Sequence, residues 1–255
     1  MGFEETLGLI SLGIAVGAVG TLIGAGGGFL LIPVFLFLYK DRGPGVLTAI
    51  SLAVICANAT SGSIAYAKMK RINYRGGLLF ALAAIPGSVV GAIIIDYISS
   101  GTFDIVFGIT LIAVGAYLFI SGKRFKSHPA GSESIPPYNV RLGMIISVFV
   151  GLLSSLLGIG GGIIHVPMMV YILKFPVHFA TATSHFVLAI MTLTATIVHI
   201  YKGDLSGQWY IVLMLSVGVI IGAQIGAAVS QKFESSWIIK ILAAAIVIVG
   251  VRILL

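Results

Sequence analysis

Glycine and proline recur together in two long apolar stretches, GAGGGFLLIP at residues 24–33 and GIGGGIIHVP at residues 158–167. Both residue types interrupt helices, and irregular backbone at membrane depth is tolerated only where it is buried in protein or lines a wet cavity. At such a break, free backbone N–H groups and the positive end of a helix dipole form a site for an anion. Close packing between helices is the alternative purpose of these glycines. The glycines expected to contact a substrate are Gly26, Gly27, Gly28, Gly160, Gly161 and Gly162.

Polar side chains within the neighbouring apolar runs are further candidates for contacts with an anion. Ser51 and Ser184 occupy matching positions after the two stretches, where they either donate to bound oxygens from two sides or bond back to their own helices. Ionisable groups within membrane segments are functional candidates by default, whereas His199 is expected near the membrane surface. The predicted substrate-binding side chains are Ser51, Asn58, His165, Ser184 and His185.

The remaining reactive residues argue against other kinds of site. All the acidic residues lie at segment ends or in loops, which disfavours cation coordination and carboxylate proton relays. The histidines lack the spacing of a metal site, and Cys56 is the single cysteine, so no metal and no cofactor is expected. Ser184 beside His185 suggests a nucleophile with its base, but adjacent residues on a helix do not face each other. We therefore expect no catalytic residue and no enzyme activity.

The composition places these residues in a membrane. Of the 255 residues, 58% are hydrophobic and 9% are charged, which is typical of a polytopic membrane protein. Basic residues gather between the apolar segments instead of forming a basic domain, so nucleic-acid binding is not expected. Ten apolar segments are predicted, at residues 3–23, 29–39, 46–66, 77–98, 102–121, 140–157, 163–173, 180–200, 208–230 and 236–255.

The second segment of each half is too short to cross a bilayer. About eleven residues at 1.5 Å each give a helix of about 16 Å, against a hydrocarbon core of about 30 Å. Proline is comfortable in the first helical turn, so we expect Pro33 and Pro167 at or near the first helical position. The residues between each glycine triplet and its proline are then partly unwound, and each segment is a broken or re-entrant half helix.

The two halves of the chain match each other and predict an internal repeat. Gly24 and Pro33 align with Gly158 and Pro167, and an odd number of segments per half makes the second repeat inverted. The predicted organisation is a first transmembrane repeat at residues 1–121, a cytoplasmic linker at 122–139 and a second repeat at 140–255. The excess of lysine and arginine places the loops at 68–75 and 122–141 in the cytoplasm and the N-terminus outside.

The doubled G-x-G-G-G stretch followed by apolar residues and proline resembles the TauE/SafE (sulfite exporter) family. The resemblance covers essentially the whole chain, and the turn His199, Gly203, Asp204, Leu205 matches a further family pattern. It implies a polytopic anion permease of the inner (plasma) membrane, associated with export of sulfite or small organosulfonates. The chain departs from the family pattern at His185, where leucine is common, and an imidazole there would favour another oxyanion or make transport pH-dependent.

Together these observations predict an all-α polytopic membrane protein that exports small oxyanions, foremost sulfite or an organosulfonate, by alternating access between inverted repeats. The expected partners are a small inorganic or organosulfur anion and the lipid bilayer, and a homodimer is left open. Two alternatives remain: an intramembrane enzyme acting on a lipid-linked substrate, and a non-transporting membrane scaffold.

Overall fold

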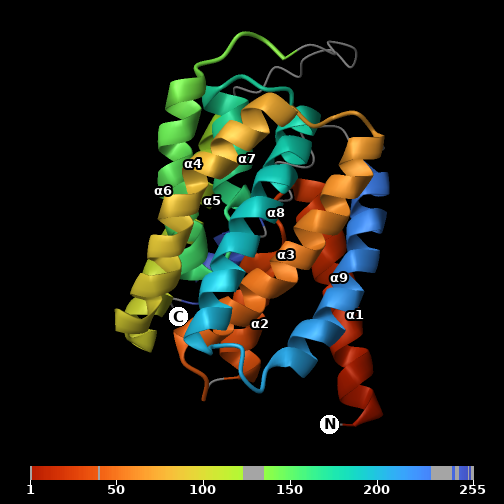
Figure 1. The fold of residues 1–255 in the computed structure, drawn as a ribbon, viewed down its shortest axis with the longest axis vertical. Coiled ribbons are helices and arrows are strands. Elements are labelled where there is room, and N and C mark those ends of the chain that lie inside the picture. Colours follow the sequence, from red (N-terminus) through yellow and green to blue (C-terminus); the bar gives the residue numbers. More distant parts are fainter. Residues whose placement is uncertain are drawn as a thin grey trace.

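The structure is a computed structural model that describes residues 2–39, 41–122 and 135–230, with residues 243–244, 247–251 and 253 near the C-terminus; for residues 117–122 the backbone alone is described. Every regular element within these ranges is a helix (Figure 1). Most of the predicted linker at 122–139, part of the tenth segment at 236–255, and the basic residues Lys123, Arg124 and Lys126 lie outside the described residues. The all-helical fold class expected from the composition is confirmed.

Six helices are long and apolar enough to cross a membrane: α1 (Phe3–Ile23), α3 (Pro44–Lys68), α4 (Tyr74–Ile94) with its extension η1 (Ile95–Tyr97), α6 (Val140–Leu157), α8 (Val177–Lys202) and α9 (Trp209–Ser230). The other elements are α2 (Gly28–Leu38), α5 (Ser100–Gly122) and α7 (Gly162–Pro167), which continues into the π-helix η2 (Met168–Ile172). These bounds lie within a few residues of the nine predicted segments that are fully described, so the protein is a multi-pass membrane protein.

Helices of the first and second halves alternate in the bundle. α1 packs against α9, α4 packs against α6, and α3 packs against α8 in the centre. Exchanging the two halves turns the α1–α9 pair into the α6–α4 pair and leaves the α3–α8 pair unchanged. This pairing is what two related halves would produce, although the repeat itself stays a prediction from the sequence.

The N-terminus and the start of α6 lie at opposite ends of the bundle. In Figure 1, α1 begins at the lower end beside the N label, whereas α6 begins at the upper end. The first helices of the two halves therefore start from opposite ends of the bundle.

The position expected for the two prolines is wrong. Pro33 is the sixth residue of α2, and Pro167 is the last residue of α7, so GFLLI and GIIHV are already helical. The break is confined to the residues before them, 24–27 and 158–161, because these glycines adopt left-handed backbone angles that end the preceding helix. After Pro167, which lacks an N–H group, the helix widens to the π form in η2.

Glycines let α1 and α9 approach until backbone meets backbone. A Cβ atom built on Gly222 would lie 2.3 Å from the carbonyl oxygen of Ile14, and one on Gly218 would lie 2.3 Å from that of Ile10. The α4–α6 pair has the same feature, because a Cβ atom built on Gly91 would lie 2.3 Å from the carbonyl oxygen of Leu152. Small residues at such contacts are the usual basis of helix association in membranes.

We predict that Gly222→Val destabilises the protein by about 1–3 kcal/mol, because the new side chain must push α1 away from α9. Gly8→Val is the matched control, since a Cβ at Gly8 meets nothing within 4 Å. Thermal unfolding in detergent micelles measures both variants. Equal unfolding temperatures for the two would contradict the close approach.

Candidate functional site

The candidate site is built from two helix breaks with the same backbone conformation. Gly24 ends α1 with a φ of 82°, and Gly26 and Gly27 follow with φ of 80° and 92°. In the second half, Gly158, Gly160 and Gly161 have φ of 66°, 83° and 71°. This left-handed region is disfavoured for residues with a Cβ atom, so the glycine spacing G-x-G-G is required by the backbone itself.

The two breaks lie directly against each other. A Cβ atom built on Gly28 would be 2.4 Å from the carbonyl oxygen of Gly158, and one on Gly162 would be 2.2 Å from that of Gly24. Each helix therefore begins beside the end of the helix in the opposite half. Only glycine allows this contact, which brings the glycines predicted from the two stretches together at one place.

The place where the two breaks touch, the crossing, accepts hydrogen bonds from Ser51 and Ser184 on two sides. The Ser51 hydroxyl on α3 donates to the carbonyl of Gly158 at 2.7 Å, and the Ser184 hydroxyl on α8 donates to the carbonyl of Gly24 at 3.1 Å. Both serines are fully buried. Their hydroxyl protons thus bond to backbone carbonyls of the opposite half in this structure. The sequence had suggested two other roles, donation to an anion and bonding back to their own helices.

Some backbone donors at the first break lack such partners, whereas those of Gly24, Ala25 and Gly26 bond to carbonyls at the end of α1. At the start of α2, Leu30 and Leu31 donate to the carbonyl of Gly27, but within the described part of the chain no acceptor faces the N–H groups of Gly27, Gly28 and Phe29. The first N–H groups of a helix cannot bond within it and carry the positive end of the helix dipole. These groups lie at the crossing, beside the end of α6.

A polar network connects the first break to His185. The Asn58 amide donates to the carbonyl of Gly26 at 2.9 Å, and the Thr21 hydroxyl donates to the Asn58 carbonyl oxygen at 3.1 Å. His185 Nε2 lies 3.2 Å from Thr21 Oγ1, and the Tyr66 hydroxyl donates to the backbone carbonyl of Thr21 at 2.8 Å. The structure therefore brings Asn58 and His185 together at the break.

Thr21 and Tyr66 were missed by the reasoning from sequence. Thr21 corresponds to Ser155 in the second half, and both are buried hydroxyls three residues before the first glycine of a break. Ser155 bonds the Ser88 hydroxyl at 2.7 Å, so it too has a partner. The matching hydroxyls of Thr21 and Ser155 in the two halves were the sequence signal that could have found this pair.

His165 belongs to a different contact. Its Nε2 lies 3.1 Å from the hydroxyl of Ser147 on α6, and that hydroxyl also bonds to the carbonyl of Gly143 at 2.8 Å. His165 is fully buried on α7. The structure places it beside the second break but does not join it to the network of His185.

Ser184 and His185 do not pair with each other. The serine donates to Gly24, and the histidine faces Thr21 on another helix. No group of three His, Cys, Asp or Glu side chains that could hold a metal ion occurs within the described ranges. The arrangement here therefore suits binding through N–H groups better than nucleophilic attack.

A cluster of charged side chains closes the end of the bundle nearest the N-terminus. Lys202 Nζ lies 2.8 Å from Asp96 Oδ1 on η1 and 3.1 Å from Asp204 Oδ2 in the loop after α8. His199 Nδ1 lies 2.6 Å from the same Asp204 oxygen and is fully buried within the protein, in the last turn of α8 at this end of the bundle. Burial alone would raise the pKa of Asp204, but hydrogen bonds from His199 and Lys202 and the Lys202 charge hold it below its ordinary value.

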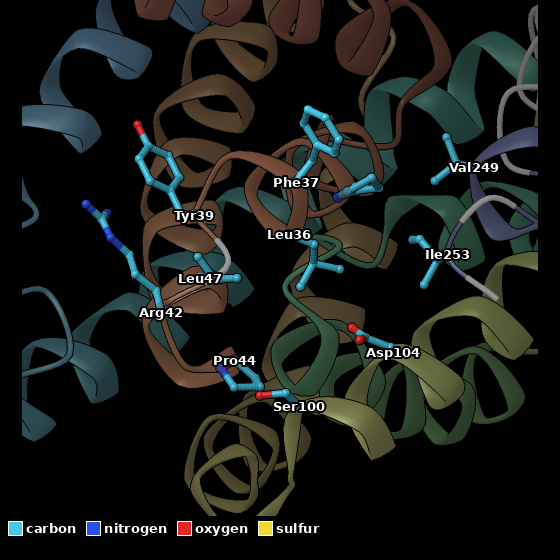
Figure 2. Close-up of a pocket in the computed structure, with 11 residues that line it drawn as sticks. Leu36, Phe37, Tyr39, Arg42, Pro44, Leu47, Ser100, Asp104, Val249 and Ile253 are labelled. Atoms are coloured by element: carbon cyan, nitrogen blue, oxygen red, sulfur yellow. The ribbon is translucent and has the colours of Figure 1, made fainter. Parts of the chain in front are cut away.

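A pocket of about 430 Å³ lies away from the two breaks, between α2, α3, α5 and the C-terminal residues (Figure 2). Its wall is mostly apolar, with Arg42, Ser100 and Asp104 as polar members. Arg42 stacks over the Tyr39 ring at 4.2 Å and donates to Gln208. Pro33 and Leu36 on α2 face this pocket, whereas the glycines that begin α2 face the crossing.

The comparisons with known proteins show that this bundle of membrane helices is a membrane transporter. The sequence matches the family described as "Sulfite exporter TauE/SafE" over residues 9–253, and the chain belongs to this family. Probable membrane transporter protein YunE of Bacillus subtilis is 32% identical over 264 residues, covering 96% of both chains. A probable membrane transporter protein of Methanocaldococcus jannaschii is 29% identical, covering 97% of this chain and 94% of its own. No solved structure matches the chain.

We predict that Ser51→Ala and Ser184→Ala each destabilise the protein by about 1–3 kcal/mol, because each leaves a buried carbonyl of a break without its donor. Thr60→Ala is the control, because the Thr60 hydroxyl is exposed and bonds to its own helix at Cys56. Chemical unfolding in mild detergent gives the free energies. Serine variants as stable as Thr60→Ala would show that the two hydrogen bonds do not hold the crossing.

Proposed function

We propose that this protein is a permease that exports small oxyanions, foremost sulfite or an organosulfonate, by alternating access at the crossing of the two breaks. The observation that carries the proposal is the contact of Gly28 with Gly158 and of Gly162 with Gly24, which gathers unpaired N–H groups at one buried place. Broken helices of inverted repeats that meet between the halves are a recurrent plan for substrate sites in secondary transporters. Membership of the TauE/SafE family supports the anionic class of the substrate.

The charge distribution supports an anion over a cation. The acidic side chains among the described residues are Glu4, Glu5, Asp41, Asp96, Asp104 and Asp204, which lie in loops or within a few residues of a helix end. The polar groups at the breaks are instead hydroxyls, an amide, imidazoles, and backbone N–H and carbonyl groups. An anion at the crossing would meet donors and no carboxylate.

The orientation proposed for the chain places the N-terminus outside the inner membrane. Lys68 ends α3 and Lys70 follows in the loop before α4, while Arg141 lies at the start of α6. The end of α3 and the start of α6 are at the end of the bundle opposite the N-terminus (Figure 1). Lysine and arginine accumulate on the cytoplasmic side of membrane proteins. With 100 mV inside negative, one negative charge gains about 2.3 kcal/mol on leaving, which corresponds to about fifty-fold in concentration.

The crossing is closed in this structure. Ser51, Asn58, Ser184 and His185 are all fully buried, so a substrate reaches them only after one side of the bundle opens. Movement of one half against the other would expose the crossing to each side in turn. The charged cluster of Asp96, Lys202 and Asp204 would close the outer side in the present state.

The decisive experiment is flux of radiolabelled sulfite, methanesulfonate and sulfate in proteoliposomes made with purified protein. We expect wild type to move at least one of them well above empty liposomes. Wild type that moves none of a broad anion panel would overturn the proposal and favour the scaffold alternative. Conversion of a lipid-linked substrate without anion flux would favour the enzyme.

We further predict that Gly27→Ala and Gly161→Ala lower this flux at least tenfold while the protein still inserts. Each replaces a residue with left-handed φ, and a Cβ at Gly27 would also lie 2.9 Å from the Val16 carbonyl oxygen. Strain of this kind costs about 1–3 kcal/mol and displaces the N–H groups. Gly43→Ala is the control, because Gly43 has an ordinary φ of −65° and open space around it. Unchanged flux in the two variants would rule out the breaks as the site.

A further inference from the structure

We propose that His185 is a proton-binding site linked to the anion site, so that the anion is bound more tightly when His185 carries a second ring proton. The inference rests on the proposed function, because it concerns recognition at the same crossing. It is argued from the hydrogen bonds around the ring, the unpartnered ring nitrogen and the groups packed against it.

The direction of each hydrogen bond in the network is fixed by what the groups can donate. Only the amide nitrogen of Asn58 can donate to the carbonyl of Gly26, so its oxygen faces Thr21. That oxygen accepts the single proton of the Thr21 hydroxyl. Thr21 can then only accept from His185, so a proton occupies Nε2 of the ring. Nδ1 is left as the titrating nitrogen.

Nδ1 is buried and has no hydrogen-bond partner among the described residues. In the neutral ring it is an unused acceptor, and an unpaired buried polar atom costs free energy. With a proton added, it becomes an N–H donor on a cation, and a buried cation requires a negative partner. An anion at the crossing supplies that partner, whereas a neutral substrate would not.

The groups around the ring offer no other counter-ion. α1 presents Thr21, and α3 presents Gly62 and the titratable Tyr66, whose ring centroid lies 5.7 Å from that of His185. A Cβ at Gly62 would lie 2.5 Å from the imidazole, so this glycine makes the slot for the ring. α4 approaches the next residue, Phe186, through Gly77 and places no charge there. Among the described residues, no charged side chain contacts this ring.

The position of His185 connects its proton to the substrate. The neighbouring Ser184 holds the carbonyl of Gly24, and the chain of Thr21 and Asn58 holds that of Gly26, so both supports of the first break meet around His185. Linkage between two binding events is reciprocal: a proton that favours the anion is itself favoured by the anion. Full linkage to one proton changes the anion affinity by about tenfold per pH unit.

The test is equilibrium exchange of labelled methanesulfonate and sulfate in proteoliposomes with the same pH on both sides, from about pH 5.5 to about pH 8, where histidine titrates. Both probes keep a constant charge over this range, so a pH effect belongs to the protein. Wild type is expected to bind more weakly as the pH rises, by up to about tenfold per unit. His185→Gln is expected to lose this dependence, because its amide can replace the Nε2 donor toward Thr21 but gains no proton.

His165→Gln is the matched control, because His165 is also buried, with Nε2 on a hydroxyl and Nδ1 unpartnered among the described residues, but it lies outside the network of Thr21 and Asn58. It should keep the pH dependence of wild type, whatever its own rate. Anion exchange that is equally pH-dependent in His185→Gln overturns the inference while leaving the proposed function intact. Absence of flux for every anion overturns the proposed function instead.

A second measurement does not depend on flux. Wild type labelled with ¹⁵N-histidine is titrated in detergent with and without methanesulfonate, and the His185 resonances are assigned by their absence in His185→Gln. Protonation of Nδ1 at higher pH when the anion is present supports the inference. An Nδ1 signal that methanesulfonate and sulfate leave unchanged contradicts it.

Discussion

The arrangement of the bundle depends on hydrogen bonds to two carbonyl groups, those of Gly24 and Gly158. Each ends a membrane helix, and lipid offers no partner for a carbonyl released in this way. Each accepts a hydrogen bond from a serine on the long central helix of the other half: Ser184 on α8 donates to Gly24, and Ser51 on α3 donates to Gly158. The break in one half is therefore tolerable only because the other half is present.

This mutual dependence explains why the halves interleave. α3 and α8 must pack against each other so that each serine reaches the opposite carbonyl, and α1 and α6 must end close together so that the glycines can touch. The outer helices then follow, with α9 against α1 and α4 against α6 through glycine-lined contacts. The same arrangement brings the unpaired N–H groups at the start of α2 to the crossing, where the substrate site is proposed.

The two sides of the crossing differ in chemistry although they share a backbone. The first break is held by Thr21, Asn58 and His185, while the matching positions of the second half include Ser155 and Met191. The network that contains His185 therefore has no counterpart of the same residue types in the second half.

The sequence alone determined the membrane class, the nine described helices to within a few residues, and the glycines of both breaks, because hydrophobic runs and left-handed backbone angles impose strict residue types. It misplaced Pro33 and Pro167, since where a helix restarts depends on the last left-handed glycine and not on the proline. Only the tertiary structure decided that Ser51 and Ser184 serve carbonyls, that His199 is buried with Asp204, and that Thr21 joins Asn58 to His185. These are contacts between distant segments, and a hydroxyl or imidazole does not reveal its partner until packing places that partner beside it.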